Sequence, residues 1–314
     1  MSYDVACVGL TLLDILGRPL AHIPDGGGVS LIDDIRLTIA GTAAGAAVHC
    51  AKLGLGTLLV GAVGEDEKGD LVFTFARRAG IDVSALQRVA DFPTSATILT
   101  IRSNGDRPAF HRLGASNFLL VEASDYERVL GGKFLHFGGV GALPRMDGQP
   151  TADLLAAAKK RGCTVTCDLI APTMGTLDAL KAALPHVDYF MPSLEEAAAI
   201  SGLNEPAEVA RFYMDLGAGA CVFKWGARGS YLATRDGHEH IPAFKVSVVD
   251  TTGCGDSYCA GFIAGLHLGW PVERACRLAT AASALVATGL GTDAGIVSLE
   301  ETIKAMETLP VLVP

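Results

Sequence analysis

The 314-residue chain has few aromatic residues, no long apolar run and no excess of basic residues. Aromatic side chains make up 6% of the sequence, and the formal net charge is -9. Because a nucleic-acid-binding surface needs clustered lysine and arginine, we expect no nucleic acid as a main partner. No apolar stretch reaches the roughly 20 residues of a membrane-spanning helix, and the first residues do not resemble a secretory leader. We therefore expect a cytoplasmic protein that does not contact membranes.

Two common nucleotide-binding motifs are also missing from the sequence. It contains neither Gly-x-Gly-x-x-Gly nor Gly-x-x-x-x-Gly-Lys-(Ser/Thr). These absences count against a dinucleotide-dependent dehydrogenase and against a Walker-type NTPase. The eight cysteines lie mostly within apolar runs, and Cys163 and Cys167 do not have the spacing of a zinc or redox pair. They are expected to be buried, reduced thiols.

Half of the residues are hydrophobic, and after residue 120 apolar strands alternate with amphipathic helices. This alternation predicts one α/β domain over residues 1–314, with a mostly parallel sheet covered on both faces. Ligands of such sheets bind beyond the carboxyl ends of the strands. The expected strands of the main sheet are residues 5–10, 57–64, 134–137, 164–167, 187–191 and 220–224.

Two segments, about residues 12–39 and 94–114, interrupt this pattern. Apolar and polar residues alternate loosely in both, and Asn104-Gly105 is a strong hairpin signal in the second. We interpret the two segments as strands of a small sheet outside the main fold, which would act as a lid. The basic residues of the second segment could meet an anionic group on a substrate, although most are expected to be solvated. They are Arg102, Arg107, His111 and Arg112.

The most informative stretch, residues 250–261, lies where a strand is expected to meet a helix. Residues 246–249 are mostly β-branched and predict the end of a strand, whereas residues 257–268 predict a helix. Gly253 and Gly255 would lie at this junction, where unpaired backbone amides carry partial positive charge. Glycine lets a ligand approach the backbone closely, so the stretch predicts an anion-binding site.

Asp256 directly follows the second glycine. A carboxylate at a helix N-terminus often serves only as a cap, and that is the plainer interpretation. A cap, however, does not require a glycine on each side of Cys254. Beside a phosphate site, a carboxylate can accept the proton of a hydroxyl group that attacks phosphorus. We therefore favour a catalytic base.

The run Asp-Thr-Thr-Gly-Cys-Gly-Asp-Ser-Tyr-Cys-Ala-Gly at residues 250–261 resembles the C-terminal signature of the ribokinase-like, or PfkB, carbohydrate kinases. Cys254 and Tyr258 stand where that family usually has Ala and Phe. The resemblance implies a three-layer sandwich with a mostly parallel central sheet and a small β-sheet lid. It also implies ATP and Mg²⁺ as cofactors. The implied catalytic residues are Gly253, Cys254 and Gly255 as an anion hole, and Asp256 as the base.

The same resemblance implies how the substrate is held. Asp14, shortly after the first strand, would bind sugar hydroxyls. The family's Gly-Gly-x-x-x-Asn motif appears here with Ala40 in place of the first Gly and Gly45 in place of the Asn. Some sugar-acid kinases and fructokinases have an Asp-x-Asn-x-Arg run, of which this sequence keeps only Asp168. These departures point away from sugar acids and fructose. The implied substrate-binding residues are Asp14, Gly41, Thr42, Gly45 and Asp168.

Further segments resemble the nucleotide side of the family's site. Residues 192–197 resemble its Pro-Asn-x-x-Glu-Ala run, with Glu196 holding magnesium through water, although an ordinary exposed helix acid is the alternative. Lys224, in the nucleotide-loop segment, would contact a phosphate or simply end a strand. Some members also bind a monovalent cation such as K⁺ near Asp250 and the loop after Ala287. The implied nucleotide-binding residues are Ser193, Lys224, Gly226, Gly229, Thr251 and Thr280.

The sequence thus predicts an ATP-dependent phosphotransferase acting on a hydroxyl of a sugar or sugar-like molecule. Because family members often pair through the lid, a homodimer is expected. A nucleoside kinase of the same fold remains an alternative, since the usual sugar-binding asparagine is replaced by Gly45. A catalytically silent sugar- or nucleotide-binding protein is the alternative of another class, against which the intact run Gly253–Asp256 argues.

Overall fold

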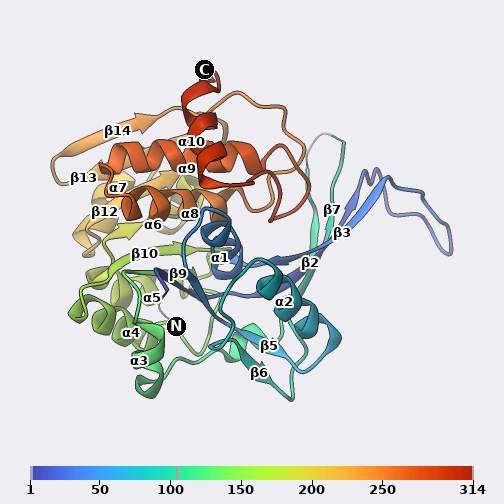
Figure 1. Ribbon diagram of the computed structural model, residues 1–314, viewed down its shortest axis with the longest axis horizontal. Coiled ribbons are helices and arrows are strands. Elements are labelled where there is room, and N and C mark those ends of the chain that lie inside the picture. The colour runs from blue at the N-terminus through green and yellow to red at the C-terminus, as the bar shows by residue number, and fades with distance from the viewer. Residues whose placement is uncertain (1–2, 104–105, 313–314) are drawn as a thin grey trace.

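The computed structural model describes residues 3–103 and 106–312, and its centre is an eight-stranded sheet (Figure 1). The strand order is β14-β13-β12-β11-β10-β9-β1-β4. The pairs from β4 through to β12 are parallel, and β13 and β14 add an antiparallel edge. The strands are β1 (Val5–Gly9), β4 (Thr57–Val60), β9 (Phe134–Val140), β10 (Thr164–Leu169), β11 (Tyr189–Phe190), β12 (Ala220–Lys224), β13 (Ser230–Thr234) and β14 (Gly237–Ile241).

Helices cover both faces of this sheet, which confirms the expected layered α/β fold. Alternate residues of a strand point to opposite faces, and in β1 Val5 and Cys7 join one buried cluster while Ala6 and Val8 join another. The first cluster lies under α1, α8 and α9, and the second under α4, α5 and α7. The helices are α1 (Thr42–Lys52), α2 (Glu67–Arg78), α3 (Tyr126–Val129), α4 (Gln149–Lys160), α5 (Thr176–Ala183), α6 (Leu194–Ser201), α7 (Pro206–Asp215), α8 (Cys254–His267), α9 (Val272–Val286) and α10 (Leu299–Thr308).

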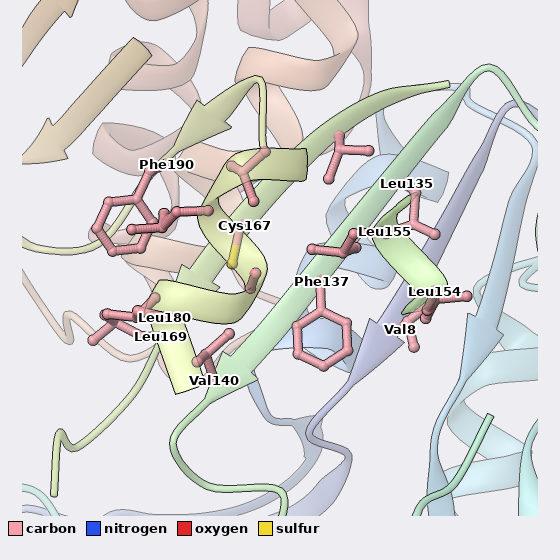
Figure 2. Close-up of a cluster of buried hydrophobic side chains, with 14 of the residues drawn as sticks. Val8, Leu135, Phe137, Val140, Leu154, Leu155, Cys167, Leu169, Leu180 and Phe190 are labelled. Atoms are coloured by element: carbon pink, nitrogen blue, oxygen red, sulfur yellow. The ribbon is translucent and has the colours of Figure 1, made fainter. Parts of the chain in front are cut away.

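Figure 2 shows part of the second cluster, where side chains of the neighbouring strands β1, β9, β10 and β11 meet those of helices α4 and α5. Phe137 and Cys167 come from adjacent parallel strands, and Leu154 and Leu180 come from the covering helices. All four are fully buried. Because burying such a side chain contributes about 1.5–3 kcal/mol, this packing holds the strand ends, and hence the residues that follow them, in fixed positions.

A four-stranded small sheet projects from one end of the main body (Figure 1). Its order is β3-β2-β7-β8, so it joins both segments that the sequence analysis set apart. In β2, Asp14 pairs in register with Thr38 and Thr97, and all three side chains are buried. The strands are β2 (Leu12–Arg18), β3 (Asp34–Ala40), β7 (Ala96–Thr100) and β8 (Ala109–Arg112), and a separate two-stranded sheet contains β5 (Ala62–Gly64) and β6 (Gln87–Val89).

The expected strand at residues 246–249 is wrong. This segment pairs with no strand there, and only Phe244, just before it, forms an isolated bridge. Val248 is exposed, and the Val249 amide donates to the Ala287 carbonyl at the end of α9. The β-branched residues therefore line a loop beside α9. Helix α8 also begins earlier than expected, at Cys254. The Asn104-Gly105 turn lies outside the described residues.

The expectation of reduced and mostly buried thiols is confirmed. All eight cysteines carry free thiols, seven of them buried. Over the described ranges, the structure shows no helix with both the length and the apolar character that crossing a membrane requires.

We predict that Gly9→Ala strongly destabilises the protein. Gly9 ends β1 with a φ of 138°, and a Cβ atom there would lie 1.9 Å from the Gly138 carbonyl oxygen of β9. The expected loss in the free energy of unfolding is about 3 kcal/mol or more, measured by urea denaturation. Gly54→Ala is the matched control, because Gly54 also has positive φ but faces open space. It should lose only about 1 kcal/mol, and equal losses would contradict the argument.

Candidate active site

A pocket of about 830 Å³ opens where the small sheet meets the carboxyl ends of the central strands. The small sheet and α1 form one end, the first turn of α8 lies in the middle, and the loop 243–248 with α9 forms the other end. The site residues expected from the sequence line this pocket, except Gly45. They are Asp14, Gly41, Thr42, Asp168, Ser193, Glu196, Lys224, Gly226, Gly229, Thr251, Gly253, Cys254, Gly255, Asp256 and Thr280.

The first turn of α8 is shaped to present its backbone to a ligand. Gly253 precedes the helix with a φ of 80°, and a Cβ atom there would lie 2.7 Å from the Thr292 Cα atom. The Cys254 thiol donates to the Ser283 carbonyl in α9, and burial raises its pKa to about 11, so the thiol stays neutral. The Cys254 amide donates to the Thr251 carbonyl at 3.3 Å. Amides of a first helical turn in general lack partners within the helix and are aligned with its dipole, which suits a phosphoryl oxygen.

A lysine ammonium lies beside this turn. A Cβ atom on Gly255 would be 3.3 Å from Lys224 Nζ, at the end of β12. Lys224 donates to Asp168 Oδ2 at 2.5 Å; the Asp168 side chain is buried, and the Lys224 side chain is 14% exposed. Burial alone would lower the pKa of Lys224, but the Asp168 carboxylate outweighs burial and raises it. The ammonium is therefore charged at neutral pH and fixed next to the anion-binding turn.

Asp168 has several other partners. Its Oδ1 atom accepts from the Leu169 amide at 2.9 Å, and its Oδ2 atom also accepts from the Cys259 thiol at 3.6 Å. A carboxylate with these three donors is held in one orientation. Asp168 thus orients Lys224, and it also lines the pocket, as expected of the substrate-binding residue that the sequence predicts.

Asp256, on the first turn of α8, is the central carboxylate of the pocket. A Cβ atom on Gly45 of α1 would lie 2.2 Å from Asp256 Oδ2, so the carboxylate lies directly against the backbone of α1. Burial raises the pKa of Asp256 to about 7, with a further contribution from the nearby Asp168 charge that Lys224 opposes. A carboxyl group poised near neutrality is suited to accept a proton.

The small-sheet end of the pocket offers hydroxyl-binding groups. Burial raises the pKa of Asp14 to about 7, opposed by a hydrogen bond from Thr97. Thr42 begins α1, and within the described residues its buried Oγ1 atom has no hydrogen-bond partner. Buried hydroxyl groups normally have a partner, so a polar ligand group is a suitable one for Thr42.

Arg107 makes a contact that its sequence context does not predict. It lies just before β8, lines the pocket, and its Nη1 atom donates to Thr252 Oγ1 at 3.3 Å. Burial raises the pKa values of both Asp14 and Asp256, and the charge of Arg107 opposes that rise. The sequence offers no signal that singles out Arg107, because three other basic residues lie in the same inserted segment. Its approach to α8 depends on how the small sheet folds over the pocket.

The other end of the pocket contains the residues expected to contact a nucleotide. Ser193 and Glu196 cap α6 reciprocally, with Ser193 Oγ donating to Glu196 Oε2 at 2.7 Å. The Ala171 amide donates to the other Glu196 oxygen at 3.3 Å. Thr280 Oγ1 donates to the Cys276 carbonyl within α9, which leaves its lone pairs as acceptors.

A buried carboxylate orders the loop behind the anion-binding turn. Asp250 Oδ1 accepts from the Thr252 amide and hydroxyl, and Oδ2 accepts from the Gly291 amide at 2.9 Å. The loop that contains Thr292 is thereby held against Gly253. Asp250 thus supports the geometry of the turn from behind.

Comparison with known proteins gives one consistent result. The model of the pfkB family carbohydrate kinases matches residues 2–298. Fructokinase-2 of Oryza sativa subsp. japonica is 26% identical, over 86% of this chain and 85% of its own. The 2-dehydro-3-deoxygluconokinase of Thermoproteus tenax is 28% identical, over 85% of this chain and 86% of its own.

Solved structures agree with the family match. Ribokinase from Thermotoga maritima superimposes with a TM-score of 0.81 at 25% identity, covering 98% of this chain and all of its own. Arabidopsis thaliana ribokinase, solved with ribose and ATP, gives a TM-score of 0.80 at 23% identity, covering 98% of this chain and 99% of its own. With its glycine-flanked turn, partly buried aspartate and ribokinase-like fold, this chain belongs to the pfkB family of carbohydrate kinases.

Proposed function

We propose that the protein transfers the γ-phosphoryl group of ATP to a hydroxyl group of a sugar or sugar-like small molecule. The observation that carries this proposal is the placement of Asp256. Its carboxylate lies in the middle of the pocket, on the same helical turn as the Gly253–Gly255 amides and near Lys224. A base and an anion-binding turn are thus adjacent, as phosphoryl transfer to a hydroxyl requires.

The substrate would occupy the small-sheet end. Asp14 is suited to accept hydrogen bonds from sugar hydroxyls, and the unpartnered Thr42 hydroxyl provides another polar contact. Gly41 lines the same end and keeps the start of α1 open to the ligand. Gly45 would act indirectly, by leaving space for Asp256.

ATP would occupy the end formed by loop 243–248 and α9, with its phosphates directed toward α8. Gly226, Gly229 and Thr251 line this end. Glu196 fits magnesium bound through water, because its oxygens accept from Ser193 and Ala171 and so stay fixed in the pocket wall. When bound, Mg²⁺ neutralises charge on the transferring phosphates.

In the proposed step, Asp256 accepts the proton of the substrate hydroxyl as its oxygen attacks the γ-phosphorus. The new P–O bond replaces the bond to ADP, which leaves. The amides of Gly253–Gly255 and the Lys224 ammonium stabilise the charge on the transferred oxygens. Arg107 adds a cation from the small sheet, whose closure over the substrate would exclude water.

A nucleoside kinase remains a second candidate, because Gly45 replaces the asparagine expected to contact a sugar. Aminoimidazole riboside kinase of Salmonella typhimurium is 26% identical, over 71% of this chain and 72% of its own. A turnover panel of sugars, sugar phosphates and nucleosides decides between the two.

We further propose that two chains pair through the outer face of the small sheet. An apolar row crosses the four strands of this sheet, because one apolar residue of each strand pairs in register with the next. The row consists of Leu37, Ile15, Ile98 and Phe110. Ile98 and Phe110 are 50% and 55% exposed. A contiguous exposed apolar row of this kind fits a protein interface.

Two finer assignments complete the proposal. The eight free thiols fit the reducing cytoplasm. The loop carbonyls that Asp250 orders are suited to a monovalent cation such as K⁺, since hard cations prefer oxygen ligands.

We predict that Asp256→Asn reduces kcat on the order of 10²–10⁴-fold while ATP binding is retained, because only proton transfer is lost. ADP release, measured over the substrate panel with Mg²⁺, provides the readout. Asp178→Asn is the control, since Asp178 is also a first-turn aspartate but is exposed on α5. If Asp256→Asn turns over like wild type, Asp256 is only a cap. If wild type binds ATP but no substrate raises ADP release, a silent binding protein is favoured.

We also predict opposite effects of pH on activity and stability. Because the pKa of Asp256 is about 7, kcat/KM should fall about tenfold per pH unit below that value.

For stability, the native pKa of Asp256 exceeds the unfolded value of about 3.9, so the stability contribution of Asp256 declines as pH rises from about 4 to 7. Asp256→Asn should therefore be roughly 2–4 kcal/mol more stable than wild type at pH 8. The two proteins should be equally stable near pH 4. A constant difference in urea denaturation across this range would contradict the assignment.

Ile98→Lys should separate the paired chains. A charge in the centre of the apolar row has no partner there, so sedimentation should show a monomer where wild type is a dimer. Val297→Lys is the control, because Val297 is 79% exposed but lies before α10. A monomeric wild type, or an Ile98→Lys variant that stays dimeric, would refute pairing through this face.

A further inference from the structure

The segment 310–312, which follows α10, is built onto the far end of the pocket. Phe244 and Val311 form an antiparallel bridge. The Lys245 amide donates to the Pro310 carbonyl at 2.8 Å, and the Leu312 amide donates to the Ala243 carbonyl at 2.7 Å. These backbone hydrogen bonds make the segment a short strand alongside the loop 243–245, although it is separated from that loop by more than 60 residues of sequence.

The side chains of this short strand point in alternate directions. Val311 is 38% exposed and does not line the pocket, whereas Leu312 is half-buried and lines it. Leu312 is therefore a wall residue of the pocket, and Val311 lies on the other side of the same segment.

The part of the pocket that Leu312 helps to enclose is apolar. Val246, Ala284 and Ala287 line it as well, and Lys245 at its rim is exposed. The phosphate-binding features, Lys224 and the first turn of α8, lie in the middle of the pocket. A nucleotide suits this arrangement, because its flat and largely apolar base would fit the apolar end of the pocket. Its anionic phosphates would then lie at the first turn of α8.

We propose that residues 310–312 form the outer wall of the slot for the nucleotide base, and that the Leu312 side chain packs against the base. This proposal rests on the proposed function, because it assumes that the pocket binds ATP. It assigns a role in nucleotide binding to a segment after the last helix, for which the sequence shows no motif.

The test compares two ligands that differ in whether they carry a base. One is the non-hydrolysable ATP analogue AMPPNP and the other is inorganic tripolyphosphate, each titrated calorimetrically with Mg²⁺ present. Leu312→Ala removes apolar contact with the base and keeps the backbone hydrogen bonds, so AMPPNP should bind about tenfold more weakly. Tripolyphosphate should bind as it does to wild type. Val311→Ala is the matched control, and both ligands should bind to it as they do to wild type.

Several outcomes would overturn the proposal. These are wild-type affinity of Leu312→Ala for AMPPNP, an equal loss for both ligands, or an equal loss in Val311→Ala. Thermal unfolding of both variants checks that the fold is retained, and Leu312→Met, which keeps most of the apolar volume, should restore AMPPNP binding. If wild type binds no AMPPNP, the base slot and the kinase function fail together. If AMPPNP binding behaves as expected but no substrate turns over, only the kinase function fails.

Discussion

The carboxylate of Asp256 fits where it does because residue 45 has no side chain. Helices α1 and α8 pack closely, and the space that a Cβ atom would need on Gly45 contains the Asp256 carboxylate. This contact buries the group and contributes to the rise of its pKa to about 7. The proposed base therefore depends on a glycine from a distant part of the chain, at the position where the family pattern has asparagine.

The charges around Asp256 form a compact and partly compensated set. Asp168 and Lys224 pair, so that the ammonium lies beside the anion-binding turn with a fixed orientation. Arg107 approaches from the small sheet and donates to Thr252, whose own hydroxyl donates to Asp250. Because these groups come from separate elements, small displacements of the small sheet would change the electrostatic environment of both Asp14 and Asp256.

The sequence was informative wherever a local pattern determines structure. The run at residues 250–256 indicated a helix start preceded by a glycine turn, and the structure has both, with Gly253 just before α8. The alternation of strands and helices likewise predicted the main sheet. Both features depend on neighbouring residues.

The rest depends on contacts between distant residues. The β-branched residues 246–249 satisfy strand propensity, but they border the pocket beside α9 and have no strand partner. The pairing of Asp168 with Lys224 was not predicted, because Lys224 lies two strands away in the sheet. Arg107 and Leu312 reach the pocket only through folding of the small sheet and of the segment after α10. No local pattern marks either residue.

The central claim is that Asp256 is a partly buried carboxyl group that titrates near neutral pH and acts as the base. Its ionisation is measured directly by carbon NMR of protein labelled at the aspartate carboxyl carbon, with Asp256→Asn used to assign the signal. We predict a titration midpoint about 7, shifted from the roughly 3.9 of an ordinary aspartate. A midpoint near 4 would show a solvated cap residue and would contradict the account.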